Sequence, residues 1–239
     1  MEHKILDVSI RDSYYYSGRT PSISDVEVVV DTLVNMGINN IEIGYCETQA
    51  SSKKSRNFLL GGNEEYNNFL AKKFQQNQQL RFFIMIHPHK CMDLEELEKA
   101  VKADFIYGVR ILYKESYKEL IEKQISICKK YHKKVYLNVT RITEKDNQAI
   151  EEAFHFAVKK QSDGFYIADS NSNILCDEFA ELLLNLKQLS THYHRGEMIL
   201  GFHPHDGLGM ALANTLLSLD HGFDMIDGSF ILPFGKFQY

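Results

Sequence analysis

Several common signatures are missing from this 239-residue chain, and each absence removes a class of function. The four cysteines are scattered, without the C-x-x-C spacing of a zinc knuckle or the density of a disulfide scaffold. No apolar run approaches the length of a transmembrane helix, and no secretory leader precedes the first strand-like segment. The net charge of −5 provides no basic footprint for nucleic acid. We therefore expect a cytoplasmic protein that binds neither nucleic acid nor a membrane.

Nucleotide-binding loops are absent as well, because no G-x-G-x-x-G follows the first predicted strand and no P-loop occurs. The chain instead alternates short apolar runs with amphipathic segments. The runs predict strands at residues 5–10, 38–46, 80–86, 104–112, 134–139, 164–168, 198–202 and 224–229. The segments between them predict helices that begin near a capping box at 24–27 and then cover 63–79, 94–101, 117–131, 146–160, 177–189 and 211–221.

This alternation predicts an α/β fold. Parallel strands need a crossover connection, which a helix between successive strands supplies. Eight such units in a chain of this size favour a closed (β/α)8 TIM barrel over an open doubly wound sheet, as one domain over residues 1–239. Only residues 230–239 follow the last predicted strand, too few for a full eighth helix. We therefore expect a homo-oligomer, or a partner subunit that completes the barrel and covers its exposed apolar surface.

Polar residues gather where the predicted strands end. His203 and His205 follow the seventh strand. Because side chains of an extended segment alternate, both imidazoles project to one side and could bind one metal ion. Arg11 and Asp12 close the first strand, ahead of a Tyr-rich loop at 13–23, and a structural salt bridge is the alternative to a role in a site. Other strands end in Glu42, Thr140 and Asp169.

Two further groups could compete for such roles. His87 and His89 form a second H-x-H at the end of the third strand, for which metal binding, ligand contact and a surface position all stay open. Cys46 follows the second strand, and we interpret it as a small buried hydrophobe because nothing nearby in sequence would lower the pKa of its thiol.

Taken in order, these motifs resemble the DRE-TIM metallolyase family, which includes 4-hydroxy-2-oxovalerate aldolase, hydroxymethylglutaryl-CoA lyase, and the isopropylmalate and homocitrate synthases. Residues 5–12 (ILDVSIRD) resemble its D-x-T-L-R-D-G motif, and 41–44 (IEIG) its E-x-G. Residues 203–214 (HPHDGLGMALAN) resemble H-x-H-[ND]-x-x-G-x-A-x-A-N, and 168–170 and 227–229 resemble its sixth- and eighth-strand motifs. The resemblance spans nearly the whole chain. It departs at Ser13, which replaces the glycine after R-D.

The resemblance implies a divalent ion held by Asp12, His203 and His205. Mixed oxygen and nitrogen ligands with open positions suit Mn²⁺, Co²⁺, Zn²⁺ or Mg²⁺. We expect Mn²⁺, with the other three ions as alternatives. Arg11, beside the ion, would stabilise the negative charge of an enolate. Tyr15 stands where the family's aldolases carry a histidine, and would either shuttle a proton or pack within its loop.

The strand-end residues complete the expected site. Glu42 would hold Arg11 or a ligand histidine. Asp169 would bind substrate or position a ligand, and Thr140 would contact a substrate carboxylate or face solvent.

The implied activity is that of a divalent-metal-dependent aldolase-like lyase, which breaks or forms a C–C bond of a small 2-oxo acid through a metal-stabilised pyruvate enolate. One alternative is a Claisen-type enzyme that condenses an acyl-CoA with a 2-oxo acid; the family's synthases usually carry extra C-terminal domains. The other alternative is a catalytically degenerate barrel that serves as a subunit or binding module. The altered R-D-G motif and the short segment after the last predicted strand favour this alternative.

Overall fold

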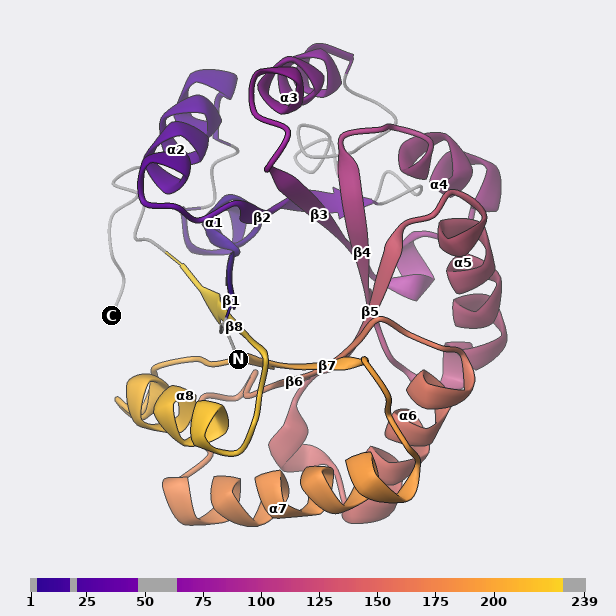
Figure 1. The fold of residues 1–239 in the computed structure, drawn as a ribbon, viewed down its shortest axis with the longest axis vertical. Helices are drawn as coiled ribbons and strands as arrows, with labels where there is room; N and C mark the ends of the chain where they lie inside the picture. The colour runs from indigo at the N-terminus through magenta and orange to yellow at the C-terminus, as the bar shows by residue number, and fades with distance from the viewer. Residues whose placement is uncertain (1–3, 18–20, 47–63, 230–239) are drawn as a thin grey trace.

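The chain closes into a parallel barrel, which confirms the predicted TIM barrel (Figure 1). The computed structural model describes residues 4–17, 21–46 and 64–229, and within them each strand pairs with the next and the first pairs with the last. The strands are β1 (Lys4–Asp7), β2 (Asn40–Cys46), β3 (Arg81–Ile86), β4 (Ile106–Leu112), β5 (Lys134–Val139), β6 (Gly164–Ala168), β7 (Ile199–His203) and β8 (Met225–Gly228).

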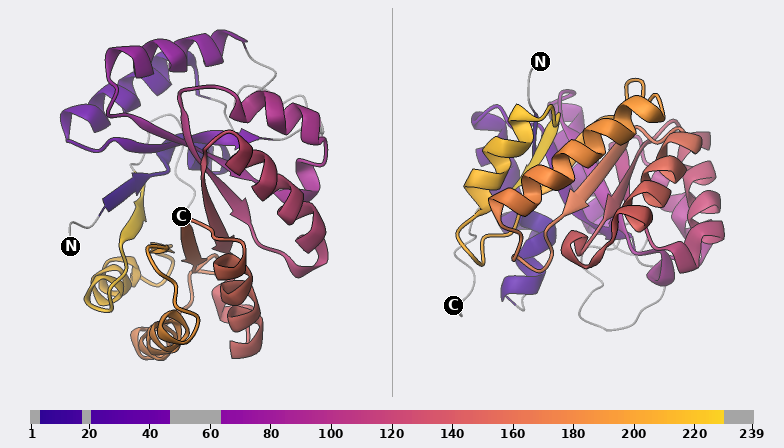
Figure 2. Two further views of the ribbon diagram at one scale, coloured as in Figure 1. Left: turned by 45° about the vertical axis from the view of Figure 1, so that its right-hand side comes forward. Right: turned by 90° about the horizontal axis from the view of Figure 1, so that it is seen from below.

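Helices surround the strands, and in both views of Figure 2 they lie outside the ring. They bury apolar stripes such as Val26, Val30 and Leu33 of α2 against the barrel. The helices are α1 (Ser9–Ser17), α2 (Ile23–Asn35), α3 (Glu64–Gln76), α4 (Leu94–Val101), α5 (Lys118–Lys130), α6 (Asn147–Lys159), α7 (Cys176–His192) and α8 (Ala211–Asp220), with short 3₁₀ turns η2 (Pro88–Lys90), η3 (Glu115–Tyr117) and η4 (Ile142–Glu144).

The start of the chain differs from its prediction. The first strand ends at Asp7, and residues 9–17 form α1 instead of continuing the strand and a loop. The Asp7 carboxylate accepts hydrogen bonds from the backbone N–H and hydroxyl of Ser9, which turns the chain at that point. This local bond and the burial of Ile10 override the strand preference of β-branched residues. The capping box of α2 is also displaced, to Ser22 and Asp25.

Aromatic rings fill the barrel at mid-height. Phe83, Tyr136 and Tyr166 belong to one buried cluster, with ring centroids 5.3 Å apart for Phe83–Tyr136 and 5.8 Å apart for Tyr136–Tyr166. Three glycines on strands make room for the rings. A Cβ atom would lie 2.6 Å from the Phe83 ring at Gly108, 2.8 Å from Tyr136 at Gly164 and 2.2 Å from Tyr166 at Gly201.

The helical layer is open beside β1 and β8 in the described part of the chain, between α2 and α8 (Figure 1). Ile5 of β1 is accordingly 50% exposed. The expectation that a full eighth helix is missing concerns residues 230–239, which lie outside the described residues. No helix in the described ranges combines the length and apolar character needed to cross a membrane.

The close packing of Gly201 yields a stability prediction. We expect Gly201→Ala to lower the free energy of unfolding by roughly 1–3 kcal/mol, because the added methyl forces the Tyr166 ring out of its place. Gly228→Ala on the next strand is the matched control, since its Cβ would meet only Ile5 at 3.7 Å. Thermal unfolding of both variants measures the difference, and equal melting temperatures would contradict this packing.

Candidate active site

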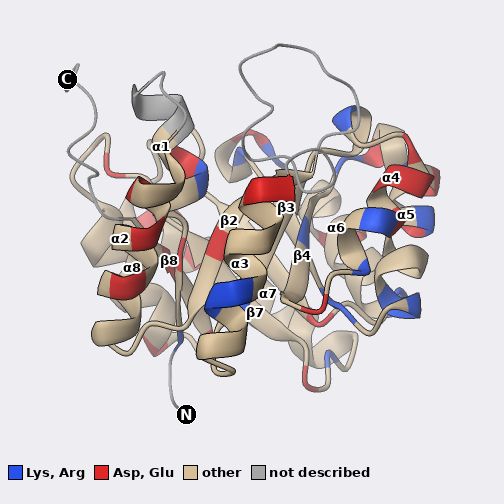
Figure 3. Cartoon of the chain, turned by 90° about the horizontal axis from the view of Figure 1, so that it is seen from above, with Lys and Arg blue, Asp and Glu red and all other residues tan. Residues whose placement is uncertain are grey.

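A buried charged layer lies next to the aromatic layer, toward the carboxyl ends of the strands. Arg110 is two residues beyond Gly108 on β4, and its guanidinium lies 4.4 Å from the centre of the Tyr166 ring. It donates to Glu42 Oε2 of β2 at 3.1 Å and to Asp227 Oδ2 of β8 at 2.6 Å. Figure 3 shows charged segments on the strands β2 and β4. The network therefore ties three strands of the barrel together.

Arg11 continues this network toward the mouth of the barrel. Its Nε donates to Glu42 Oε2, and its Nη1 donates to the Asp12 carboxylate and lies 3.4 Å from the Tyr45 hydroxyl. Burial by itself would lower the pKa of Arg11, but the Glu42 and Asp12 carboxylates hold this pKa well above its ordinary value. Arg11 thus stays a fixed positive charge, held by Glu42, which the sequence predicted to hold either Arg11 or a ligand histidine.

The two histidines of the H-x-H motif lie side by side, with ring centroids 4.8 Å apart. His203 Nδ1 is 2.7 Å from Asp227 Oδ2, and His205 Nδ1 is 2.7 Å from the backbone oxygen of Asp169. A carboxylate or carbonyl on one ring nitrogen is the usual way to orient a metal-binding imidazole through the other. Burial, with a contribution from His203, lowers the pKa of His205, which favours the neutral form that a metal requires.

This arrangement provides only part of a metal site. Within the described ranges, no three His, Cys, Asp or Glu side chains are grouped to hold an ion. The structure brings His203 and His205 together, while the carboxylate of Asp12 is paired with Arg11. The two imidazoles fit a metal site, and the third predicted ligand is engaged elsewhere.

The remaining predicted residues have separate positions. The Asp169 carboxylate is buried and accepts the backbone N–H groups of Asn173 and Ile174, at 3.1 and 3.3 Å, so it shapes the loop after β6. Thr140 follows β5, half-buried, and its hydroxyl bonds to no described residue. Tyr15 belongs to α1, and its side chain lies outside the described part of the structure.

The competing groups have neighbours other than the histidine pair. The His87 ring is 5.2 Å from that of Tyr45 and 5.9 Å from that of His89. Cys46 is 1% exposed, as expected of a small buried hydrophobe, and its sulfur is 3.7 Å from that of Cys91.

Sequence reasoning did not place Arg110 or Asp227 among the site residues. Burial would raise the pKa of Asp227, but Arg110 and His203 together lower it below its ordinary value, so the carboxylate stays charged. The available signal was an arginine inside the apolar run 106–112, at a position that alternation places on the barrel interior.

Several buried polar atoms of this region have no hydrogen-bond partner among the described residues. They are Glu42 Oε1, Arg110 Nε, Asn138 Oδ1, the Tyr166 hydroxyl and Asp227 Oδ1. Buried polar groups in native proteins are nearly always paired, with protein or with water. These atoms are therefore the places where water or the polar groups of a bound molecule would be held.

Comparison with known protein families assigns this chain to one of them. A family model described as HMGL-like matches residues 107–231, slightly more than half of the chain. The chain belongs to the HMGL-like family. The matched segment contains Arg110, His203, His205 and Asp227, and the resemblance to the DRE-TIM metallolyases is thereby confirmed.

Individual relatives of this HMGL-like chain are distant. A 4-hydroxy-2-oxovalerate aldolase of Pelotomaculum thermopropionicum is 24% identical over 95% of the chain and 64% of its own length. An oxaloacetate decarboxylase of Mycobacterium tuberculosis is 24% identical over 97% of the chain and 65% of its own length. The chain thus spans slightly less than two thirds of these relatives.

Solved structures share the fold. The N-terminal domain of a proposed aldolase from Bacteroides vulgatus superposes with a TM-score of 0.76 at 21% identity, covering 98% of this chain and 74% of that one. The carboxyl transferase domain of Rhizobium etli pyruvate carboxylase superposes with a TM-score of 0.72 at 15% identity, over 95% and 40% of the two chains.

Asp7, at the end of β1, gives a prediction about pH. Burial raises the pKa of its carboxyl group from 3.8 to about 6, despite the hydrogen bonds from Ser9. A folded-state pKa above the unfolded value favours folding below about pH 4, and this contribution is lost as the pH rises through about 6. We expect Asp7→Asn to gain stability over wild type across this interval, by at most ~3 kcal/mol, because one pKa unit corresponds to about 1.4 kcal/mol.

Urea unfolding from pH 4 to pH 8 measures this difference. Asp220→Asn, at an exposed position at the end of α8, is the control for a general effect of removing one carboxylate. Stability curves that run parallel for wild type and Asp7→Asn would contradict the buried, raised-pKa carboxyl group.

Proposed function

We propose that this protein is a divalent-metal-dependent carbon–carbon lyase that acts on a small 2-oxo acid in the manner of an aldolase. One observation carries the proposal: two oriented imidazoles share a buried layer with two arginines, Arg11 and Arg110, at the carboxyl ends of the strands. Enzymes with this fold place their active sites at that end.

The charges of the layer suit an anionic substrate together with a cation. With neutral imidazoles, the carboxylates of Asp12, Glu42 and Asp227 outnumber the guanidinium groups of Arg11 and Arg110 by one. A divalent ion held by His203 and His205, and by Asp12 once its carboxylate turns from Arg11 to the ion, would offset this excess and supply Lewis-acid polarisation of the 2-oxo group. Mixed N and O ligands accept Mn²⁺, Co²⁺, Zn²⁺ and Mg²⁺. We propose Mn²⁺, with the other three ions as alternatives.

The chain's own residues then have defined tasks. Arg11 directs a rigid N–H donor at the oxygen that becomes negative as the C–C bond breaks, and Glu42 fixes its orientation. Asp227 orients His203, and Arg110 keeps Asp227 ionised and in place. Tyr15 carries the proton of the substrate hydroxyl, Thr140 contacts the substrate carboxylate, and Asp169 positions His205 through its backbone oxygen.

The distant relatives favour a substrate that yields pyruvate enolate. Aldol cleavage of a 4-hydroxy-2-oxo acid and decarboxylation of oxaloacetate both leave this enolate, and both activities occur among the relatives that match nearly the whole chain. A Claisen-type synthase is less favoured, because a 2-isopropylmalate synthase of Aquifex aeolicus matches over only 46% of the chain and 21% of its own length.

A partner is part of the proposal. Ile5 of β1 is half-exposed at the open side of the helical layer, and Leu212 and Leu216 of α8 are exposed as well. We propose that a second copy of the chain or a partner subunit covers this apolar surface.

Metal content tests the proposed function first. Wild-type protein, dialysed and then offered Mn²⁺, is expected to retain about one ion per chain and to release pyruvate from 4-hydroxy-2-oxovalerate or oxaloacetate. His203→Ala is expected to lose both the ion and the activity, because removal of one of two imidazoles leaves too few ligands. His221→Ala, on the loop after α8, is the matched control.

Both measurements can contradict the proposal. Wild type that binds none of the four ions would remove the lyase assignment. Metal binding without activity on either substrate would instead favour the degenerate barrel.

Arg11→Lys tests the electrostatic part of the mechanism. We expect kcat to fall roughly 100-fold or more with metal binding retained, since loss of one oriented donor to a developing oxyanion costs about that much. Arg141→Lys, an exposed substitution after β5, is expected to keep wild-type activity. An Arg11→Lys enzyme with wild-type kcat would show that Arg11 serves only to hold Glu42 in place.

A further inference from the structure

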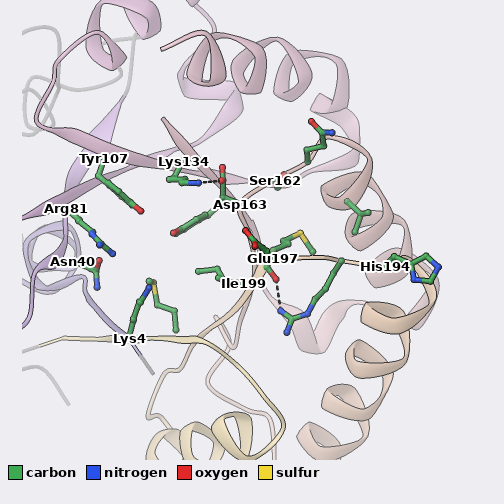
Figure 4. A pocket seen from close by; sticks show the side chains of 16 residues that line it. Lys4, Asn40, Arg81, Tyr107, Lys134, Ser162, Asp163, His194, Glu197 and Ile199 are labelled. Carbon is green, nitrogen blue, oxygen red and sulfur yellow. Dashed lines mark hydrogen bonds and ion pairs between the residues drawn. The ribbon is translucent and has the colours of Figure 1, made fainter. Parts of the chain in front are cut away.

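A cavity of about 490 Å³ opens at the end of the barrel opposite the candidate active site (Figure 4). Its walls include the first residues of several strands, among them Lys4, Asn40, Arg81, Lys134 and Ile199. Asn40, Arg81 and Lys134 each precede a residue of the interior charged or aromatic layer by one two-residue repeat, and Lys4 and Ile199 likewise precede Leu6 and Gly201. The cavity is therefore built by the barrel itself.

Positive charge without an acidic partner gathers on one wall. Lys4 and Arg81 line the cavity, and neither forms an ion pair with any described residue. Arg81 instead lies 5.1 Å from the centre of the Tyr107 ring. Figure 4 shows the ends of Lys4, Arg81 and Asn40 close together on this side.

On the opposite wall, the positive charges are paired with carboxylates of the protein itself. Lys134 donates to Asp163 at 2.7 Å, and Arg195 pairs with Asp224 at 3.2 Å. Glu197 also lies on this wall and is exposed. The electrostatic attraction for an anion is therefore concentrated between Lys4 and Arg81.

Two buried polar atoms of lining residues have no hydrogen-bond partner among the described residues. Asn40 is 9% exposed; its amide nitrogen donates to the Ile5 backbone oxygen at 3.1 Å, but its Oδ1 accepts nothing. Ser162 is 4% exposed, and its hydroxyl is likewise unpaired. Groups of this kind are rare in native proteins unless water or a ligand satisfies them.

The floor of the cavity is apolar and aromatic. Tyr136 of the mid-barrel layer and Met225 line it, beside Tyr107. Small-molecule sites have volumes of about 300–1,000 Å³ and combine apolar walls with a few polar groups, which describes this cavity.

We propose that this cavity is a second ligand site, which takes a small organic anion: a phosphate or carboxylate group between Lys4 and Arg81, and a planar or apolar body on Tyr107 and Tyr136. A hydrogen-bond donor of the ligand is accepted by Asn40 Oδ1. The aromatic layer separates this site from the imidazole pair, so a ligand here is distinct from the substrate of the lyase reaction.

Calorimetric titration of the full chain tests the site with two probes, inorganic phosphate and phenyl phosphate, in phosphate-free buffer of low ionic strength. Phenyl phosphate is expected to bind at one site per chain and more tightly than inorganic phosphate, because only it also covers the tyrosines. Lys4→Gln and Arg81→Gln are each expected to weaken binding at least about ten-fold, as loss of a hydrogen bond to a charged group does. Arg81→Lys, which keeps the charge, is expected to restore much of the affinity.

Two controls separate this site from other effects. Lys159→Gln removes the same charge at the end of α6, outside the cavity lining, and is expected to bind as wild type does. His203→Ala is also expected to bind phenyl phosphate normally, whatever its effect on lyase activity. Lys4 is exposed, so its substitution keeps the test valid even if Arg81→Gln fails to fold.

Three results would overturn the proposal. They are a wild type without saturable binding of phenyl phosphate, Gln variants that bind as wild type does, and binding that is lost in His203→Ala but kept in Lys4→Gln.

Discussion

The packing of three aromatic rings against three glycines determines the layout of this barrel. Because Phe83, Tyr136 and Tyr166 occupy the axis, Gly108, Gly164 and Gly201 cannot carry a side chain without displacing them. The next inward residue of each strand lies two residues away from this layer, toward either the carboxyl or the amino end of the barrel. Toward the carboxyl ends, these inward residues are Arg110, His203 and Asp227. Toward the amino ends, they are Arg81 and Lys134.

The two ends consequently differ in their electrostatics. At the carboxyl ends, the charges are buried and paired within a network, where Glu42 joins Arg11 to Arg110 and Asp227 joins Arg110 to His203. Removing one member of such a network leaves an unpaired buried charge, which is strongly destabilising. Paired and oriented groups of this kind suit the role that we propose for this layer, in which donors point at a developing charge. At the amino ends, two cations face an open cavity without acidic partners.

Much of this architecture could be predicted from the sequence. The bounds of β5, β6 and α4 match their predictions to the residue, because each is a compact apolar or amphipathic run with clear ends. The segment 8–17 was mispredicted, since a carboxylate–hydroxyl contact between Asp7 and Ser9 turned a β-branched run into a helix. Local periodicity carries no information about such a contact.

The residues of the candidate site could be predicted only in part, because motifs can be recognised in the sequence but contacts between distant strands cannot. Motifs pointed to His203, His205 and Arg11 as candidates, and Glu42 was predicted to hold either Arg11 or a ligand histidine. The structure pairs Glu42 with Arg11. Arg110 was overlooked within an apolar strand, although its two-residue spacing from Gly108 places it on the axis. The cavity at the amino ends depends on closure of the whole barrel, which no single segment encodes.

The central claim is that the buried layer stabilises pyruvate enolate, and exchange of the methyl protons of pyruvate with D₂O tests this most directly, because it requires no knowledge of the second substrate. Followed by proton NMR in the presence of Mn²⁺, Co²⁺, Zn²⁺ or Mg²⁺, exchange is expected to be accelerated by wild type and to fall to the buffer rate with His203→Ala. Exchange at the buffer rate for wild type with every ion would contradict the account.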